Sequence, residues 1–281
     1  MTIKDRIYHY WHYGSALNKL IMINAALFIS AHLAQGIAGS FFGQPKVVFD
    51  WINTWLALPP EVNTWITRPW TLFTYIFVHY RFSHVLFNLL VLHFAGELFM
   101  NYLGERRMLR LFFYGGLAGG ILYLLTNTVS ITTSNISMVG ASAGIIALMV
   151  AGALYMPQME VRLWGMFRVK YWMLAAAVVV FDILNLPGSN TGGHLAHLGG
   201  AAMAYFFVQS MQGNSLGKTV KRWFSRPGKK TSKKSNPKKR TKASKAENTA
   251  KMDAILDKIR QTGYDKLTDE EKAFLFKMSQ E

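Results

Sequence analysis

Residues 83–102 read SHVLFNLLVLHFAGELFMNY, a predominantly apolar run of 20 residues. A helix of about 20 mostly apolar residues is long enough to cross the hydrocarbon core of a membrane. Five further segments of this kind flank it, so the sequence predicts an all-α membrane protein with a bundle of six transmembrane helices. The predicted helices are 16–37, 83–102, 109–127, 140–156, 169–186 and 193–210. Several are short and rich in glycine and alanine, which favours close helix packing.

The distribution of basic residues gives the orientation of these helices. The positive-inside rule places loops rich in Lys and Arg in the cytoplasm. Alternate loops carry most of the basic residues, and the loops between them carry few, so both termini are expected in the cytoplasm. The basic residues in question are Lys4, Arg6, Lys19, Arg106, Arg107, Arg110, Arg162, Arg168 and Lys170, followed by the segment after the last helix.

Most of the net charge of +16 comes from one segment, because residues 218–245 contain 13 Lys or Arg and no acid. No nucleic-acid module with interleaved aromatic residues accompanies it. Its position after a membrane helix favours anionic lipid headgroups as the partner, and no nucleic acid. The chain is therefore divided into a cytosolic N-terminal segment (1–15), a membrane domain (16–211), a basic flexible linker (212–250) and a small cytosolic helix-turn-helix unit (251–281).

Smaller features complete the organisation. The chain has no cysteine, which removes disulfides and thiolate chemistry. The first apolar run is too long for a cleaved signal peptide and predicts a retained anchor. The long loop 39–69 is rich in Phe and Trp, which suits a segment in the membrane interface, either a plain anchoring loop or a lateral gate. In the C-terminal unit, Thr268 and Glu271 have the spacing of a helix capping box.

Polar side chains inside membrane helices are costly and suggest function. Three clusters lie at the starts of the second, fourth and sixth predicted helices: His84 with Asn88, the segment 140–144 (GASAG) around Ser142, and 194–200 (HLAHLGG). By the predicted topology, all three helices begin at the outer face. The clusters are therefore expected in one layer, roughly 5–10 Å below the outer boundary.

This layer has the components of acyl transfer. A serine hydroxyl becomes a nucleophile when a base removes its proton, and His197 is the candidate base for Ser142. The backbone N–H of Ser142 and the side chains of His84 and Asn88 could donate hydrogen bonds to an oxyanion. Asp182 is the carboxylate within the fifth predicted helix, and little weight is given to it as a third member.

Each motif also has a structural interpretation. The glycines of 140–144 match a helix-packing GxxxG motif, and His194 with His197 could be a metal pair, although no HExxH motif is present. Only the three clusters together favour catalysis. His79, His32 and His93 are assigned to packing or local hydrogen bonds, and His93 with Glu97 to a buried polar pair.

The order and spacing of three motifs resemble the rhomboid family over roughly residues 70–210. These motifs are His84-x-x-x-Asn88, Gly140-x-Ser142 and Ala196-His197-x-x-Gly200. The resemblance implies a six-helix rhomboid bundle and an intramembrane serine endopeptidase that cleaves transmembrane protein substrates near the outer membrane face. It implies a Ser142–His197 dyad without an acid, and an oxyanion site from His84, Asn88 and the Ser142 amide with Gly140 close by.

No cofactor or metal is expected, and the resemblance implies that His197 rather than His194 is the base. The C-terminal unit is similar to a helical appendage of some bacterial rhomboids, which suggests the bacterial inner membrane as the location. Where the family often has an aromatic residue four positions after the serine, this chain has Ile146.

Two other functions stay open. A catalytically weak rhomboid-like protein would bind transmembrane clients without cutting them. A transporter or metal-dependent membrane enzyme would use His84, His194 and His197 as ligands, and would be sensitive to chelators.

Overall fold

The structure is a computed structural model that describes residues 2–129, 136–163, 166–188, 190–212, 242–263 and 266–279. It divides into two compact units, Met1–Arg226 and Pro227–Glu281. Most of the predicted basic linker lies outside the described residues. The predicted contacts of this linker with lipid headgroups lie outside them too.

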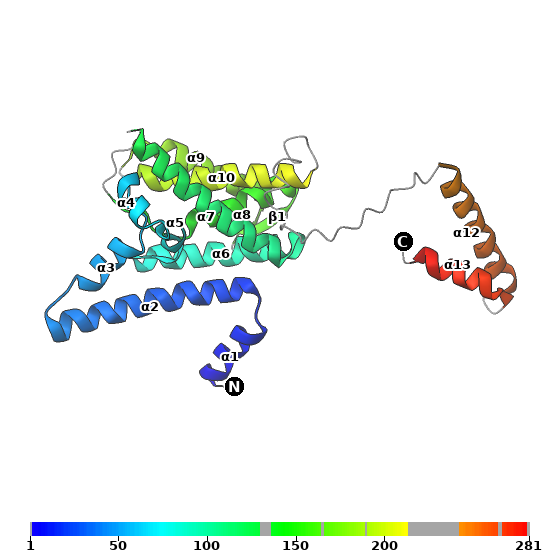
Figure 1. Ribbon diagram of the computed structural model, residues 1–281, viewed down its shortest axis with the longest axis horizontal. Coiled ribbons are helices and arrows are strands. Elements are labelled where there is room, and N and C mark those ends of the chain that lie inside the picture. The colour runs from blue at the N-terminus through cyan, green and yellow to red at the C-terminus, as the bar shows by residue number, and fades with distance from the viewer. Residues whose placement is uncertain are drawn as a thin grey trace. The chain divides into compact units, whose positions relative to one another are not determined.

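Six helices of the first unit correspond to the six predicted apolar segments (Figure 1). Each begins and ends within five residues of its prediction. The largest difference is at the end of α2, which continues until Gly43 adopts a left-handed conformation with φ of 65°. These helices are α2 (Ala16–Phe42), α6 (Phe82–Leu103), α7 (Glu105–Thr128), α8 (Ser142–Tyr155), α9 (Tyr171–Leu184) and α10 (Thr191–Met211).

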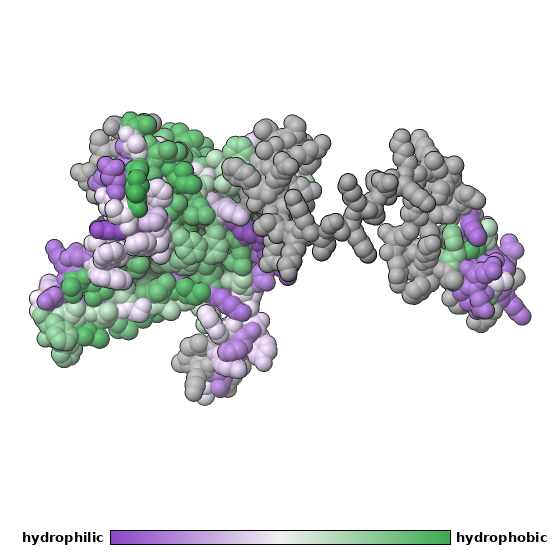
Figure 2. Space-filling view, viewed as in Figure 1, coloured by the Kyte–Doolittle hydropathy of each residue, from purple (hydrophilic) through white to green (hydrophobic). Residues whose placement is uncertain are grey.

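The helices α2, α6 and α7 are long and apolar enough to cross a membrane. The helices α8 and α9 are apolar but have 14 residues each, and α10 has 21. The predicted all-α membrane fold is confirmed, whereas the count of six spans is not. Hydrophobic residues cover much of the visible surface of this unit (Figure 2), as expected for a protein that faces lipid.

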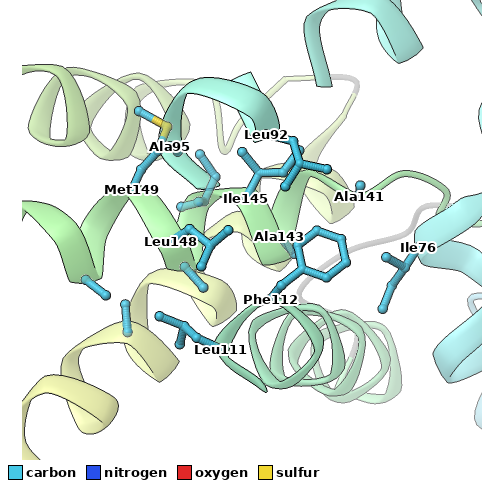
Figure 3. Packing of buried hydrophobic residues seen from close by; sticks show 14 of the residues in the cluster. Ile76, Leu92, Ala95, Leu111, Phe112, Ala141, Ala143, Ile145, Leu148 and Met149 are labelled. Atoms are coloured by element: carbon cyan, nitrogen blue, oxygen red, sulfur yellow. The ribbon is translucent and has the colours of Figure 1, made fainter. Parts of the chain in front are cut away.

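The core of the first unit is formed where α7, α8 and α10 pack together, with α6 alongside (Figure 3). Small residues allow the backbones to approach closely. A Cβ atom on Gly200 of α10 would lie 2.1 Å from the carbonyl oxygen of Ala143 in α8, and one on Gly119 of α7 would lie 2.6 Å from that of Ala196. The expectation of close packing through glycine and alanine is confirmed at these contacts.

Several elements were not predicted from the sequence. The aromatic loop contains α3 (Val47–Trp55) and α4 (Val62–Thr67), which are followed by the short helices α5 (Thr71–Thr74) and η1 (Tyr75–Phe77). The N-terminal segment forms α1 (Ile3–Tyr13), whose N-cap Thr2 makes a capping box with Asp5. An antiparallel hairpin, β1 (Glu160–Leu163) and β2 (Phe167–Lys170), connects α8 to α9.

In its described residues, the second unit contains the helices α12 (Lys242–Thr262) and α13 (Asp269–Ser279). The helix α12 begins earlier than expected, within the segment assigned to the linker. The predicted capping box is present, since the Thr268 N–H donates to Glu271 Oε2 at 2.8 Å and the Glu271 N–H donates to Thr268 Oγ1 at 3.3 Å. Lys258 of α12 forms an ion pair with Glu271 at 2.8 Å, and this interaction lowers the pKa of the Glu271 carboxyl.

Candidate active site

Ser142 is the first residue of α8, and the chain leading to it is held by backbone hydrogen bonds. Met138 and Leu58 exchange two such bonds, at 3.0 and 2.8 Å. The Gly140 N–H donates to the carbonyl of Tyr75 at 2.9 Å. Gly140 has a φ of 116°, a conformation that side chains other than glycine rarely adopt. These bonds therefore fix the direction in which the chain enters α8 and the position of Ser142 at its start.

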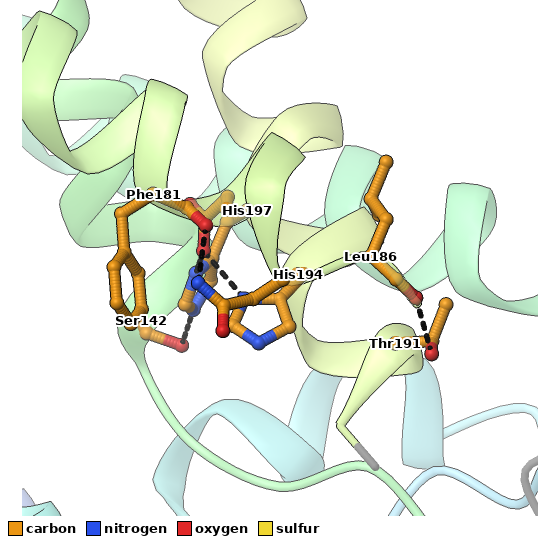
Figure 4. Close-up of polar contacts among 8 residues, drawn as sticks. Ser142, Phe181, Leu186, Thr191, His194 and His197 are labelled. Atoms are coloured by element: carbon orange, nitrogen blue, oxygen red, sulfur yellow. Dashed lines mark hydrogen bonds and ion pairs between the residues drawn. The ribbon is translucent and has the colours of Figure 1, made fainter. Parts of the chain in front are cut away.

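The structure brings Ser142 and His197 together although they are 55 positions apart in the sequence. Ser142 Oγ lies 2.7 Å from Nε2 of His197 on α10 (Figure 4). The His197 side chain is 21% exposed. Both residues are only partly buried, so the pair is not sealed inside the bundle. A hydroxyl hydrogen-bonded to an imidazole nitrogen is the arrangement that general-base activation requires.

Asp182 of α9 lies on the other side of the His197 ring. Its Oδ1 atom is 2.9 Å from Nδ1 of His197 and 2.7 Å from Nδ1 of His194. Asp182 is 2% exposed, so its carboxylate is enclosed by the bundle. The resemblance implied a histidine without an acid, and the structure differs on this point. The signal in the sequence was a carboxylate within an apolar helix, which must find a partner when buried.

His84 and Asn88 of α6 lie beside Gly140. A Cβ atom on Gly140 would lie 2.8 Å from Cε1 and 2.9 Å from Nε2 of His84, and 3.7 Å from Nδ2 of Asn88. Asn88 is buried, and its Nδ2 has no hydrogen-bond partner among the described residues. The predicted oxyanion residues His84 and Asn88 thus lie next to Gly140, two residues before Ser142.

The other histidines have varied surroundings. His32 contacts the backbone carbonyls of Phe28 and Tyr80 at 2.9 and 3.2 Å, consistent with a local structural role. His79 lies between η1 and α6, its ring 5.1 Å from that of His84, and burial lowers its pKa to about 4.

His93 and Glu97 form the expected pair, at 3.4 Å, but the prediction that it is buried is wrong: the two side chains are 59% and 55% exposed. They lie one turn apart on an outward face of α6, away from its contact with the core.

One group of side chains in the described part of the chain could converge on a metal ion. Donor atoms of Asp182, His194 and His197 all lie within 4.8 Å of one another. Aspartate and histidine are suitable zinc ligands. The separations of 2.7 and 2.9 Å between the carboxylate oxygen and the ring nitrogens are those of hydrogen bonds. The metal-enzyme alternative expected His84 in this set, and the group contains Asp182 instead.

Comparison with known proteins identifies the family. A family model described as "Rhomboid domain" matches residues 67–211, about half of the chain. The chain belongs to the rhomboid family. This confirms the resemblance drawn from the sequence motifs, and with the apolar helices it makes the chain an integral membrane protein with the fold of an intramembrane protease.

Two further similarities extend this result. Residues 238–281 match a model described as "Family of unknown function (DUF6576)", which covers the helices of the second unit. The chain is also 29% identical over 148 residues to "RHOMBOID-like protein 12, mitochondrial" of Arabidopsis thaliana. That alignment covers 48% of this chain and 44% of the relative, so the chain spans less than half of the relative's length.

Proposed function

We propose that this rhomboid is a serine endopeptidase that cleaves transmembrane protein substrates within the membrane, near its outer face. Ser142 is the nucleophile and His197 is the general base. The observation that carries this assignment is the 2.7 Å separation between Ser142 Oγ and His197 Nε2. It supports direct proton transfer from the hydroxyl to the ring as the serine attacks a peptide carbonyl.

The reaction follows from this geometry. Ser142 Oγ forms a bond to the carbonyl carbon while its proton moves to His197 Nε2. The same ring nitrogen then gives that proton to the leaving amine as the C–N bond breaks. Water attacks the resulting acyl-enzyme, again with His197 as the base, and the serine is released. Each attack, by the serine and then by water, starts with Nε2 free to accept a proton, and each bond cleavage that follows starts with Nε2 protonated, so that it can donate to the leaving amine or to Ser142 Oγ.

Negative charge develops on the carbonyl oxygen during both attacks. Candidate donors are the Ser142 amide, the His84 ring and the Asn88 side-chain amide, gathered around Gly140. The buried Nδ2 of Asn88, with no partner in the described residues, is a donor ready for such an oxygen. Because each oxyanion donor is worth about 2.7–4 kcal/mol, such a site would contribute strongly to the rate.

The short helix α8 suits a reaction below the membrane surface. Its 14 residues span about 21 Å, which is less than the roughly 30 Å of the hydrocarbon core. Ser142 at its first position can therefore lie beneath the outer boundary, within reach of a transmembrane substrate. We place both termini in the cytoplasm of a bacterial cell, with the protein in the inner membrane. The basic segment 218–245 is assigned to anionic lipid headgroups rather than to nucleic acid.

The test combines covalent labelling with substrate cleavage. The purified protein in detergent or liposomes is treated with a fluorophosphonate probe, and the labelled peptide is mapped. Cleavage of a reporter with one transmembrane segment is measured in parallel. We expect label on Ser142, and we expect Ser142→Ala to lose both label and cleavage while its melting temperature is retained. Reporter binding by a wild-type protein that neither labels nor cleaves would favour the client-binding alternative instead.

A further inference from the structure

Asp182 is a buried acid in a helix that is otherwise almost entirely apolar. The sequence of α9 is YWMLAAAVVVFDIL, and Asp182 is 2% exposed. A carboxylate enclosed in this way is costly unless it is paired. The only partners of its oxygens among the described residues are the rings of His194 and His197, both on α10. The carboxylate is therefore paired through Oδ1 alone, with the histidine that contacts Ser142 and the one a turn before it, while its buried Oδ2 has no hydrogen-bond partner among the described residues.

The direction of these hydrogen bonds determines the proton positions on His197. An ionised carboxylate can only accept hydrogen bonds, so each Nδ1 that contacts Asp182 Oδ1 carries a hydrogen. In a neutral imidazole with Nδ1 protonated, Nε2 holds a lone pair. That lone pair faces Ser142 Oγ at 2.7 Å. The carboxylate thus selects the ring form that can accept the serine proton.

We propose that Asp182 is a positioning residue for His197, so that this rhomboid acts through an Asp182–His197–Ser142 relay rather than a two-residue dyad. This inference rests on the proposed function. Asp182 keeps Nε2 basic, fixes the orientation of the ring and stabilises its positive charge after the serine proton has arrived. The proton stays on His197 until the leaving amine takes it, and Asp182 remains ionised throughout.

His194 has a separate part in this arrangement. Its Nδ1 atom binds the same carboxylate oxygen at 2.7 Å, and its ring centroid lies 6.0 Å from that of Phe181 on α9. It does not contact Ser142 in the described hydrogen bonds. The hydrogen bond from His194 holds the Asp182 carboxylate in place while the His197 ring gains and loses its positive charge. Loss of His194 should therefore be less damaging to turnover than loss of Asp182.

A purely structural role for Asp182 makes different predictions. In that case the two histidines would serve only to neutralise a buried acid. Removing the charge would alter folding stability and leave the turnover of each folded molecule unchanged. The two roles are separated by measuring kcat and KM per folded, probe-titrated enzyme, together with the pH profile of kcat.

The experiment compares Asp182→Asn, Asp182→Glu and His194→Gln with Asn185→Ala as a matched control. Asn185 belongs to the same end of α9, where its side chain donates to the carbonyl of Phe181 at 2.8 Å, and it makes no contact with His197 among the described bonds. Reporter cleavage and melting temperature are recorded for each variant.

For Asp182→Asn we expect kcat to fall by about 10²- to 10⁴-fold with KM changed less than about threefold, because the amide no longer selects the reactive ring form. The acid limb of its kcat profile should move to lower pH, since the charged ring loses its stabilising partner. Asp182→Glu should recover part of the rate, and His194→Gln should lose about tenfold at most. Asn185→Ala should match the wild type.

Wild-type kcat and pH profile in folded Asp182→Asn, or an equal loss of kcat in Asn185→Ala, would overturn the inference and leave the serine mechanism intact. Retained cleavage by Ser142→Ala would instead end the proposed function. If Asp182→Asn does not fold, or no turnover is measured, the ring form is read from ¹⁵N-histidine spectra of the wild type, with His197 identified by difference from His197→Gln. Hydrogen on Nδ1 is the expected result, and hydrogen on Nε2 would refute the relay.

Discussion

Substitution of Gly140 by alanine tests how closely the proposed oxyanion site is fitted to the serine segment. A Cβ atom at this position would lie 2.8 Å from Cε1 and 2.9 Å from Nε2 of His84. Ordinary contact begins near 3.4 Å, so the ring or the backbone must move by about 0.6 Å. The φ of 116° adds backbone strain of about 1–3 kcal/mol for a residue with a side chain.

The two effects have different consequences. Backbone strain acts on stability, whereas displacement of His84 acts on the transition state. A misplacement approaching 1 Å can cost about 10²-fold in rate, so we expect Gly140→Ala to lower kcat by about 10- to 100-fold. KM should change little, because the donors interact most strongly with charge that develops in the transition state.

Gly104→Ala is the matched control for this substitution. Gly104 also has a positive φ, 82°, but a Cβ atom there would meet nothing within 4 Å. Both variants should therefore lose stability, and only Gly140→Ala should lose turnover. The assay is cleavage of the transmembrane reporter, normalised to probe-labelled enzyme, beside a melting curve. Unchanged kcat in Gly140→Ala, or an equal loss in both variants, would refute this account of the site.

The other predictions concern an oxyanion donor, the need for a metal ion, the pH dependence of stability, and the orientation of the chain in the membrane. Asn88→Ala should lower kcat by about 10²-fold without unfolding the protein, as measured by reporter cleavage and melting, because one oxyanion donor is lost. Chelator treatment should leave cleavage unchanged, and a loss that zinc restores would favour the metal-enzyme alternative. Burial lowers the pKa of His79 from 6.5 to about 4. As the pH falls, the unfolded chain therefore binds a proton at this ring at a higher pH than the folded chain does. Stability in detergent should therefore fall as the pH drops from about 6.5 to 4, by up to roughly 3 kcal/mol, and this dependence should weaken in His79→Phe. Because the chain has no cysteine, Ser137→Cys should react with an impermeant maleimide in intact cells and Gln212→Cys only after permeabilisation.

The long helices could be predicted because hydropathy alone determines them. A run of apolar residues such as 83–102 is unsuited to any exposed loop, and the observed helix α6 extends it by one residue at each end. The short elements could not be predicted in this way. The hairpin between α8 and α9 has strands of four residues, and the helices α3 and α4 have nine and six, too few for a periodic pattern to stand out.

The membership of the site was partly predictable. The predicted helices that carry His84, Asn88, Ser142 and His197 all begin at the outer face of the membrane. This common depth indicated that the four side chains would lie close together. Depth gives no information about rotation around a helix axis, so it could not show that Asp182 points toward α10. The same limitation explains the pair of His93 and Glu97, which the sequence places within α6 but which faces outward.

Close packing of the helices and the geometry of the site are linked by one contact between backbones. Gly200 lies three residues after His197, and Ala143 follows Ser142 directly. A Cβ atom on Gly200 would lie 2.1 Å from the Ala143 carbonyl oxygen, so α8 and α10 approach as closely as glycine permits next to Ser142 and His197. A hydrogen bond of 2.7 Å between two short side chains requires this proximity. The glycine at position 200 of α10 therefore allows the short distance between the proposed nucleophile and base as well as the close packing of the bundle, and this accounts for the small residue beside a polar one in Ala196-His197-x-x-Gly200.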